Sequence, residues 1–263
     1  MLIGKITLYQ IDTIVVTGIL FVLLIIAHVV GSKLRKFSER KGMIHQDLDL
    51  GTVEGALIGL FAFFLAFTFS MSGSRFDNRR ETIIDEATKI GTAVNLADLY
   101  PDSVRTSIRG HFKKYVDYRI AYFDAGIDDD KLNAALKDGG LQSDTIWAIV
   151  SYLGKDEKYS VATRLIAPAL NEMGDIVVIR DAVKNATVPE SILWVLFLLS
   201  IGSSFMVGYG ANWKNRNSIA GIVLAAMISI SIYLIMDLDK PRRGLITTEG
   251  ANQKIVELKS LFD

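Results

Sequence analysis

The sequence predicts an all-α integral membrane protein with four transmembrane helices in two hairpins and a soluble helical bundle inserted between the second and third spans. Three observations support this fold class. Half of the 263 residues are hydrophobic and the mean hydropathy is +0.32, which is high for a soluble domain. Four largely uncharged apolar segments have the length of about 20 residues that a helix needs to cross a bilayer. The residues between the second and third segments repeat apolar positions at helical spacing.

The N-terminal hairpin is expected over residues 1–73, with spans at about residues 11–31 and 53–73. The first span could be mistaken for a signal peptide, but its apolar run is long and no small-residue cleavage site follows it. The charged sequence SKLRK at residues 32–36 follows instead, so we interpret the segment as a retained span.

The junction after the second span is the most informative feature of the chain. The apolar run Gly55–Met71 leads directly into a dense set of charges that begins at Arg75, with no helix breaker between them. This pattern predicts one helix that leaves the bilayer and continues into water as part of a soluble domain.

The soluble helical bundle is expected over residues 74–189, continuous with the second and third spans. Pro101 followed by Asp102 is typical of a helix start, because proline fits the first turn and an acidic residue favours the N-terminus. Pro168 is expected to kink or interrupt the last helix of the bundle. Turns are expected at residues 126–130 and 138–144, and later helices at about residues 145–153 and 159–186.

The C-terminal hairpin is expected over residues 190–236, with spans at about residues 191–211 and 218–236, and a charged tail follows over residues 237–263. Two hairpins would place both chain ends and the soluble bundle on the same side of the membrane. The positive-inside rule does not decide which side this is, because basic residues near the span ends are roughly balanced.

Composition argues against several classes of function. The net charge is zero, so the chain lacks the electrostatic signature of nucleic-acid binding. Cysteine is absent, which excludes disulfides, thiolate metal sites and a cysteine nucleophile. The three histidines are far apart, and no phosphate-binding loop, nucleophile elbow or zinc motif is visible. We therefore expect no catalytic residues, no metal site and no cofactor, and we expect that the protein is not an enzyme.

Small residues are expected to specify helix packing in the bilayer, because lipid provides no hydrophobic drive for helix association. The second span carries a stripe of small residues, which we assign to helix packing: Gly55, Gly59, Ala62, Ala66 and Ser70. Shorter stripes occur in the third and fourth spans, at Ser200, Ser204 and Gly208 and at Gly221, Ala225 and Ser229. The alternative is that one stripe lies at a contact between subunits, around a pore axis.

Another face of the second span is the candidate pore lining. Phe61, Phe64, Thr68 and Ser72 fall on one stripe, and a ring of such aromatic side chains from several subunits would form a hydrophobic constriction. The alternative is that the aromatic side chains face lipid or fill a core.

Charged residues follow this stripe. Arg75 and Arg79 are the candidate residues of the pore mouth, where a ring of charges would bias which ions approach. Mixed charges at three- or four-residue spacing, such as Asp77 and Arg80, are also typical of a self-paired helix surface.

Three motifs together resemble the bacterial bestrophin-like membrane proteins. They are RFDNRRE at Arg75–Glu81, EATKIGTA at Glu86–Ala93 and DLDKPRRGLI at Asp237–Ile246. The resemblance to the related bestrophin channels implies a pentamer with four spans per subunit, a soluble helical domain continuous with the second span, and an apolar neck in that span. It also implies that the soluble domain and both termini are cytoplasmic, in a multi-pass protein of the cell inner membrane.

The sequence departs from the bestrophin channels at several positions. Phe76, Asp77 and Glu81 match an aromatic residue and two acids that follow the second span in those channels, but Arg79 and Arg80 stand where tryptophans are expected. An ungapped match would put the neck on the small residues of the second span, and a shift of about one turn would put it on aromatic residues. The calcium clasp of the animal proteins has no recognisable counterpart.

We therefore expect an oligomeric, passive ion channel of the bacterial inner membrane, with a pore that is lined by the second span and extended by the soluble domain. No span carries a charge at its centre, which argues against a proton relay or an ion-coupled transporter. The expected partners are the lipid bilayer, inorganic ions and further copies of the chain, and not nucleic acid. The alternative is a non-conducting, membrane-anchored helical scaffold or sensor.

Overall fold

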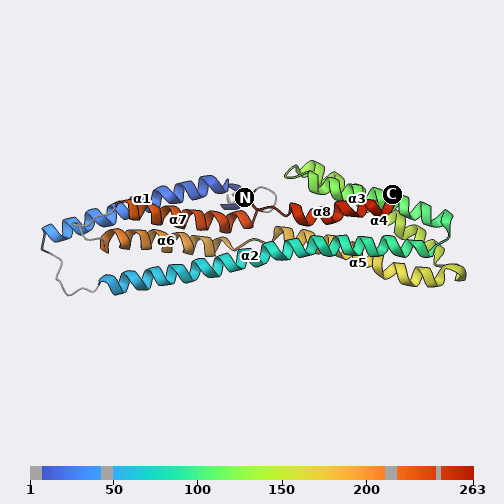
Figure 1. Ribbon diagram of the computed structural model, residues 1–263, viewed down its shortest axis with the longest axis horizontal. Coiled ribbons are helices and arrows are strands. Elements are labelled where there is room, and N and C mark those ends of the chain that lie inside the picture. Colours follow the sequence, from blue (N-terminus) through green and yellow to red (C-terminus); the bar gives the residue numbers. More distant parts are fainter. Residues whose placement is uncertain (1–7, 43–49, 211–217, 241–243) are drawn as a thin grey trace, which may run out of the picture. The chain divides into compact units, whose positions relative to one another are not determined.

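The computed structural model describes residues 8–42, 50–210, 218–240 and 244–263, and this part of the chain is helical without a strand (Figure 1). Its α-helices are α1 (Thr13–Arg40), α2 (Leu50–Leu96), α3 (Asp102–Asp124), α4 (Asp129–Leu153), α5 (Ser160–Asn185), α6 (Glu190–Gly210), α7 (Ser218–Leu238) and α8 (Glu249–Glu257). Short 3-10 turns are η1 (Leu8–Gln10), η2 (Ala97–Leu99), η3 (Glu157–Tyr159) and η5 (Leu258–Phe262). The all-α prediction is confirmed.

The chain divides into two compact units. Unit 1 comprises residues 1–74 and 187–239, and unit 2 comprises residues 75–186 and 240–263. Four described helical stretches are long and apolar enough to cross a membrane, as the sequence predicts, and their apolar parts are α1, the first half of α2, α6 and α7. The residues that would join the spans of each predicted hairpin, 43–49 and 211–217, lie outside the described residues.

Helix α2 passes from unit 1 into unit 2 without a break, which confirms the expected helical junction after the apolar run. The expected continuity between the bundle and the third span was wrong, because residues 186–189 separate α5 from α6. Pro189 explains the break. Proline has no N–H to donate within a helix, and it disfavours helical geometry in the residue before it.

Helix α4 includes a segment for which the sequence predicted a turn. Residues 138–144 lie inside α4, which begins earlier, where the Asp128 side chain accepts a hydrogen bond from the backbone N–H of Lys131. Gly139 is buried, and a Cβ atom there would lie 3.5 Å from the Cβ of Tyr118 on α3. Packing of α4 on α3 therefore overrides the local turn signal. Likewise, α5 continues through Pro168.

Unit 1 owes its close packing to small residues on α1 and α6. A Cβ atom at Gly208 would lie 2.1 Å from the backbone oxygen of His28, and one at Gly31 would lie 2.2 Å from that of Phe205. The Ser204 hydroxyl donates a hydrogen bond of 2.8 Å to the carbonyl of Leu24. The two helix backbones thus approach at a distance that larger residues would prevent.

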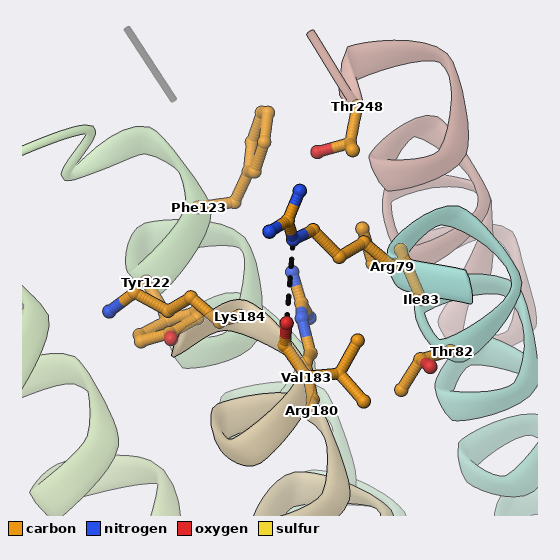
Figure 2. A pocket seen from close by; sticks show the side chains of 9 residues that line it. All are labelled: Arg79, Thr82, Ile83, Tyr122, Phe123, Arg180, Val183, Lys184 and Thr248. Atoms are coloured by element: carbon orange, nitrogen blue, oxygen red, sulfur yellow. Dashed lines mark hydrogen bonds between the residues drawn. The ribbon is translucent and has the colours of Figure 1, made fainter. Parts of the chain in front are cut away.

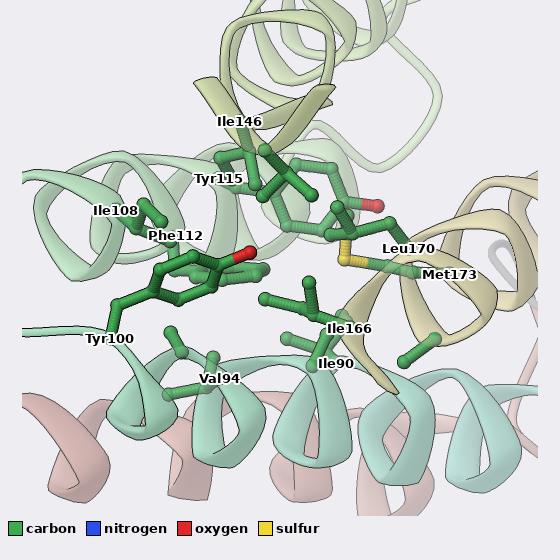
Figure 3. Packing of buried hydrophobic residues seen from close by; sticks show 14 of the residues in the cluster. Ile90, Val94, Tyr100, Ile108, Phe112, Tyr115, Ile146, Ile166, Leu170 and Met173 are labelled. Atoms are coloured by element: carbon green, nitrogen blue, oxygen red, sulfur yellow. The ribbon is translucent and has the colours of Figure 1, made fainter. Parts of the chain in front are cut away.

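Unit 2 has a hydrophobic core formed by α2, α3, α4 and α5 (Figure 3). Its fully buried side chains include Ile90, Val94, Ile108, Phe112, Ile146, Ile166 and Met173. The charged tail expected over residues 237–263 is not a separate region, because α8 packs Ala251 and Ile255 against Ile83 and Ala87 of α2. The last turn is also fixed, since Arg109 donates a hydrogen bond to the carbonyl of Leu261.

Candidate functional site

Within unit 1, α2 presents one buried face and one exposed face. Phe61, Thr68 and Ser72 lie on the buried face, with 6%, 0% and 0% of their surface exposed. The Thr68 hydroxyl donates to the carbonyl of Phe64 at 2.7 Å, and the Ser72 hydroxyl donates to the carbonyl of Ile235 on α7 at 2.8 Å. This face therefore packs against the other apolar helices of the same chain.

The structure places the expected pore-lining stripe on this buried face. Phe61 belongs to the core of unit 1, Phe64 packs against that core, and Thr68 and Ser72 are fully buried. A role of these side chains in lining a pore would require the helices of unit 1 to separate. Hydrophobicity could not reveal this arrangement, because lipid and a helix core are equally apolar.

The stripe that was expected to pack is instead exposed within the single chain. Gly55, Gly59, Ala62, Ala66 and Ser70 are all solvent-accessible, and a Cβ atom at Gly55 or Gly59 would meet nothing within 4 Å. By contrast, the small stripes of α6 and α7 are buried at Ser200, Ser204, Gly208, Ala225 and Ser229. The small-residue stripe of α2 is thus uncovered by its own chain along its full length.

Helix α2 is also the least covered of the four candidate spans. Only 17% of the residues in its most apolar stretch are buried, against 39% in each of the other three. The same face continues beyond Ser70 to the exposed residue Asp77. An apolar helix with a bare stripe of small residues has the geometry to approach further helices or an aqueous axis closely.

A buried carboxylate joins four segments at one end of unit 1. Asp239, next to the end of α7, accepts hydrogen bonds from the Tyr9 hydroxyl at 2.7 Å and from the Val188 N–H at 2.8 Å. It also accepts one from the Ser72 hydroxyl at 3.3 Å. The Tyr9 hydroxyl is also 2.9 Å from the carbonyl oxygen of Val188. This network explains why the motif Asp237–Ile246 begins with acidic residues in a region that follows a span.

Unit 2 contains a second buried polar cluster. Glu86 of α2 is completely buried, and it accepts hydrogen bonds from Arg119 of α3 and Arg180 of α5, which are 2% and 7% exposed. A second amino group of Arg180 donates to the side-chain oxygen of Asn252 on α8 at 3.0 Å. Four helices are therefore connected through one carboxylate and two guanidinium groups.

The charge states of this cluster follow from its geometry. Burial by itself would raise the pKa of Glu86, but the charges and hydrogen bonds of Arg119 and Arg180 outweigh burial and hold that pKa below its ordinary value. Burial opposes the charge of Arg119, yet Glu86 raises the pKa of that guanidinium. Burial also raises the pKa of Tyr115 to about 12. Glu86 and both arginines are thus ionised at neutral pH.

A cavity of about 40 Å³ adjoins this cluster (Figure 2). It is lined from α2, α3, α5 and the residue that precedes α8. The described lining residues are Arg79, Thr82, Ile83, Tyr122, Phe123, Arg180, Val183, Lys184 and Thr248. They include three cations and no carboxylate.

The two residues that were expected at a pore mouth have different environments. Arg79 is 4% exposed, and its guanidinium donates to the carbonyls of Val183 and Ala186 at the C-terminal end of α5. Carbonyls at a helix C-terminus favour a cation. Arg75 is partly exposed. Arg79 therefore fixes the end of α5 and lines the cavity, rather than forming part of an open charged surface.

Sequence reasoning assigned Glu86 to a surface cluster and did not recognise Arg119 or Arg180. A signal was present, because each charge falls within an apolar helical stripe. Glu86 lies between Ile83 and Ile90, each three or four residues away. In the same way, Arg119 follows Tyr115 and Val116, and Arg180 follows Met173 and Ile176. A charge in a core register indicates a buried, paired group. No group of three potential metal ligands is found in the described residues.

These observations define a membrane protein with four apolar helices, a soluble helical unit and buried polar clusters in both units. A sequence profile of the Bestrophin-like domain matches residues 19–251. Because this match covers most of the chain, the protein belongs to the Bestrophin-like family. No protein with a curated description matches the sequence significantly.

Solved structures agree with this assignment at the level of the fold. A crystal structure of a bacterial Bestrophin homolog from Klebsiella pneumoniae with a point mutation has a TM-score of 0.70 at 13% identity, covering 94% of this chain and 99% of that chain. The structure of that homolog determined by Zn-SAD phasing gives 0.65 at 13% identity, with coverages of 92% and 98%. Another membrane protein gives 0.71 at 12% identity, with coverages of 94% and 97%.

Proposed function

We propose that this protein is the subunit of an oligomeric, passive ion channel of the bacterial inner membrane, and that the exposed small-residue stripe of α2 lines its pore. The observation that carries the proposal is the contrast between the spans. The small stripes of α6 and α7 are covered by the same chain, whereas that of α2 is bare. Membership of the Bestrophin-like family agrees with a channel.

The chemistry of the stripe suits a pore. Ala62, Ala66 and Ser70 have short side chains, so copies of α2 could surround a narrow axis without their side chains closing it. Ser70 adds a hydroxyl group and Asp77 adds a carboxylate further along the same face. A conducting path of this kind needs no midplane charge, and the described spans carry none at their centres.

The proposed assembly is a ring of identical subunits, with five copies by analogy with the bestrophin channels. The soluble unit and both termini are placed in the cytoplasm by the same analogy. An assembly would also cover the apolar side chains that flank the stripe, such as Phe63 and Phe67, which are exposed in the single chain.

The experiment that tests this proposal is a current measurement on the purified protein in a planar bilayer under a KCl gradient. We expect a reproducible current, with a reversal potential whose sign gives the preferred ion. Ala66→Phe should reduce the conductance at least about fivefold, because a larger side chain would narrow the axis. The matched control Ile19→Phe, at an exposed position of α1, should leave conductance unchanged.

Native mass spectrometry of the same preparation gives the subunit number. The absence of current from a folded, oligomeric preparation would contradict the channel and favour a non-conducting scaffold. Equal conductances of Ala66→Phe and the unmodified protein would contradict the pore assignment while leaving the channel in place.

A further inference from the structure

We propose that the cavity in unit 2 beside Arg79, Arg180 and Lys184 binds a small organic carboxylate. The first argument is the local charge. Glu86 is a single carboxylate shared by two buried guanidinium groups, so the ionised cluster of Glu86, Arg119 and Arg180 has an excess positive charge. A buried excess charge is unfavourable unless an opposite charge compensates it.

The remaining cation of the cavity increases this excess. Lys184 has no carboxylate within ion-pair distance in the described part of the chain, and its ammonium group lies 5.9 Å from the centre of the Tyr122 ring. The guanidinium carbons of Arg119 and Arg180 lie 4.9 Å and 5.4 Å from the centre of the same ring. An aromatic ring compensates three cations only weakly compared with an anion.

Hydrogen-bond donors are available at the cavity wall. Thr248 is the N-cap residue of α8, but its side chain makes no capping hydrogen bond. Its hydroxyl oxygen accepts a hydrogen bond of 3.3 Å from the Asn252 amide, so the hydroxyl proton can be donated to a ligand. Thr248 is 6% exposed. A nearly buried hydroxyl beside guanidinium and ammonium groups suits a carboxylate, which accepts several hydrogen bonds at once.

Size and apolar walls narrow the class of ligand. A volume of about 40 Å³ holds roughly three water molecules, which is the space of a carboxylate with a very short chain and far too little for a nucleotide. Ile83, Phe123 and Val183 form apolar parts of the wall, against which a methyl group can pack. Acetate matches both features. A bulky hydroxylated carboxylate such as gluconate does not.

The test is a thermal unfolding titration of the intact protein in a non-ionic detergent, at constant ionic strength, with acetate, chloride or gluconate as the varied anion. A ligand that binds only the folded state raises the unfolding temperature in a saturable manner. We expect saturation with acetate, and a smaller, unsaturated response with chloride and gluconate. The readout does not depend on conduction, so the outcome is independent of the proposed channel.

Matched variants locate the site. Lys184→Met should weaken the apparent affinity for acetate about tenfold, which corresponds to about 1.4 kcal/mol for one charge-assisted contact. Lys184→Arg should restore most of it. Lys131→Met removes an exposed lysine of α4 outside the cavity and should leave the titration unchanged. Both Lys184 variants alter a partly exposed side chain, so the fold is expected to tolerate them.

Two results would overturn the proposal. One is an acetate response that is identical in Lys184→Met and the unmodified protein, because the cavity would then not contain the binding site. The other is a response of equal size to acetate, chloride and gluconate, which would indicate a general salt effect. Isothermal titration calorimetry with acetate supplies an independent affinity for each variant.

Discussion

Glu86 of α2 and Arg180 of α5 form an ion pair in the interior of unit 2, although 94 positions separate them in the sequence. The carboxylate has no exposed surface, and Arg119 of α3 occupies its other oxygen. Since Arg180 also binds Asn252 of α8, the pair connects the C-terminal segment to the helix that continues into the second span. The arrangement holds four helices in one register.

Replacing Glu86 should strongly destabilise unit 2. In Glu86→Gln, two buried guanidinium groups would lose their only carboxylate, and the loss of one partner from a buried ion pair costs about 3–5 kcal/mol. We expect a lower unfolding temperature and a lower denaturant midpoint for the intact protein in detergent, followed by circular dichroism.

The matched control is Asp85→Asn, one residue earlier on the same helix. Asp85 pairs with Lys89 one turn away at 3.2 Å, and half of its side chain is exposed. An exposed pair of this spacing contributes about 0.5 kcal/mol or less. Equal stabilities of Glu86→Gln and Asp85→Asn would show that the buried cluster is not a major source of stability.

The same pair predicts how stability depends on pH. The pKa of Glu86 is lowered in the folded protein from its ordinary value of 4.5, so the folded carboxylate stays charged where the unfolded one takes up a proton. Its contribution is complete above pH 4.5 and is lost as pH falls below that value through the folded pKa. The unfolding temperature of the unmodified protein should therefore fall more steeply on acidification below pH 4.5 than that of Glu86→Gln. Parallel profiles would contradict the assigned ionisation.

Close backbone contact between α1 and α6 predicts a sharp difference between two glycines. Gly208→Ala would place a Cβ atom 2.1 Å from the oxygen of His28, so the helices must move apart, at a cost of about 1–3 kcal/mol. Gly18→Ala on α1 meets nothing within 4 Å and should be neutral or stabilising by up to about 1 kcal/mol. Thermal unfolding in detergent compares the two variants. Similar midpoints would mean that α1 and α6 are not packed this closely.

The sequence was sufficient to predict the features that depend on local pattern. Four apolar runs, the uninterrupted junction after the second span and the helix start at Asp102 all appear in the structure. Each depends on periodicity or on the preferences of a single residue type, which neighbouring residues determine. The turn expected at residues 138–144 was wrong because packing around Gly139 stabilises the helix against its local preference.

The features that the sequence could not provide depend on contacts between distant segments. The pairing of Glu86 with Arg119 and Arg180 spans much of the chain, so local charge spacing suggested a surface cluster instead. The face of α2 that packs within unit 1 was also beyond sequence reasoning. Small residues permit close approach to any partner, and aromatic residues are as stable in lipid as in a core, so composition does not distinguish the two faces.

Single cysteines can determine which face of α2 meets water, because the chain has no cysteine of its own. Ser70→Cys would introduce a thiol on the exposed stripe, and Thr68→Cys would introduce one only two residues away on the fully buried face. If the stripe lines a pore, a charged, water-soluble methanethiosulfonate reagent should reach Ser70→Cys and change its current more than about twofold, because it adds a charge to a narrow path. The current of Thr68→Cys should be unaffected.

The measurement is the macroscopic current in planar bilayers before and after the reagent, and reversal by a reductant shows that the thiol was modified. The two positions differ in burial while they lie at nearly the same depth along the helix, so depth alone cannot explain a difference in reactivity. Modification of Thr68→Cys with no effect at Ser70→Cys would reverse the assignment. It would place the pore on the stripe of Phe61, Phe64, Thr68 and Ser72, and it would imply that the helices of unit 1 separate when subunits assemble.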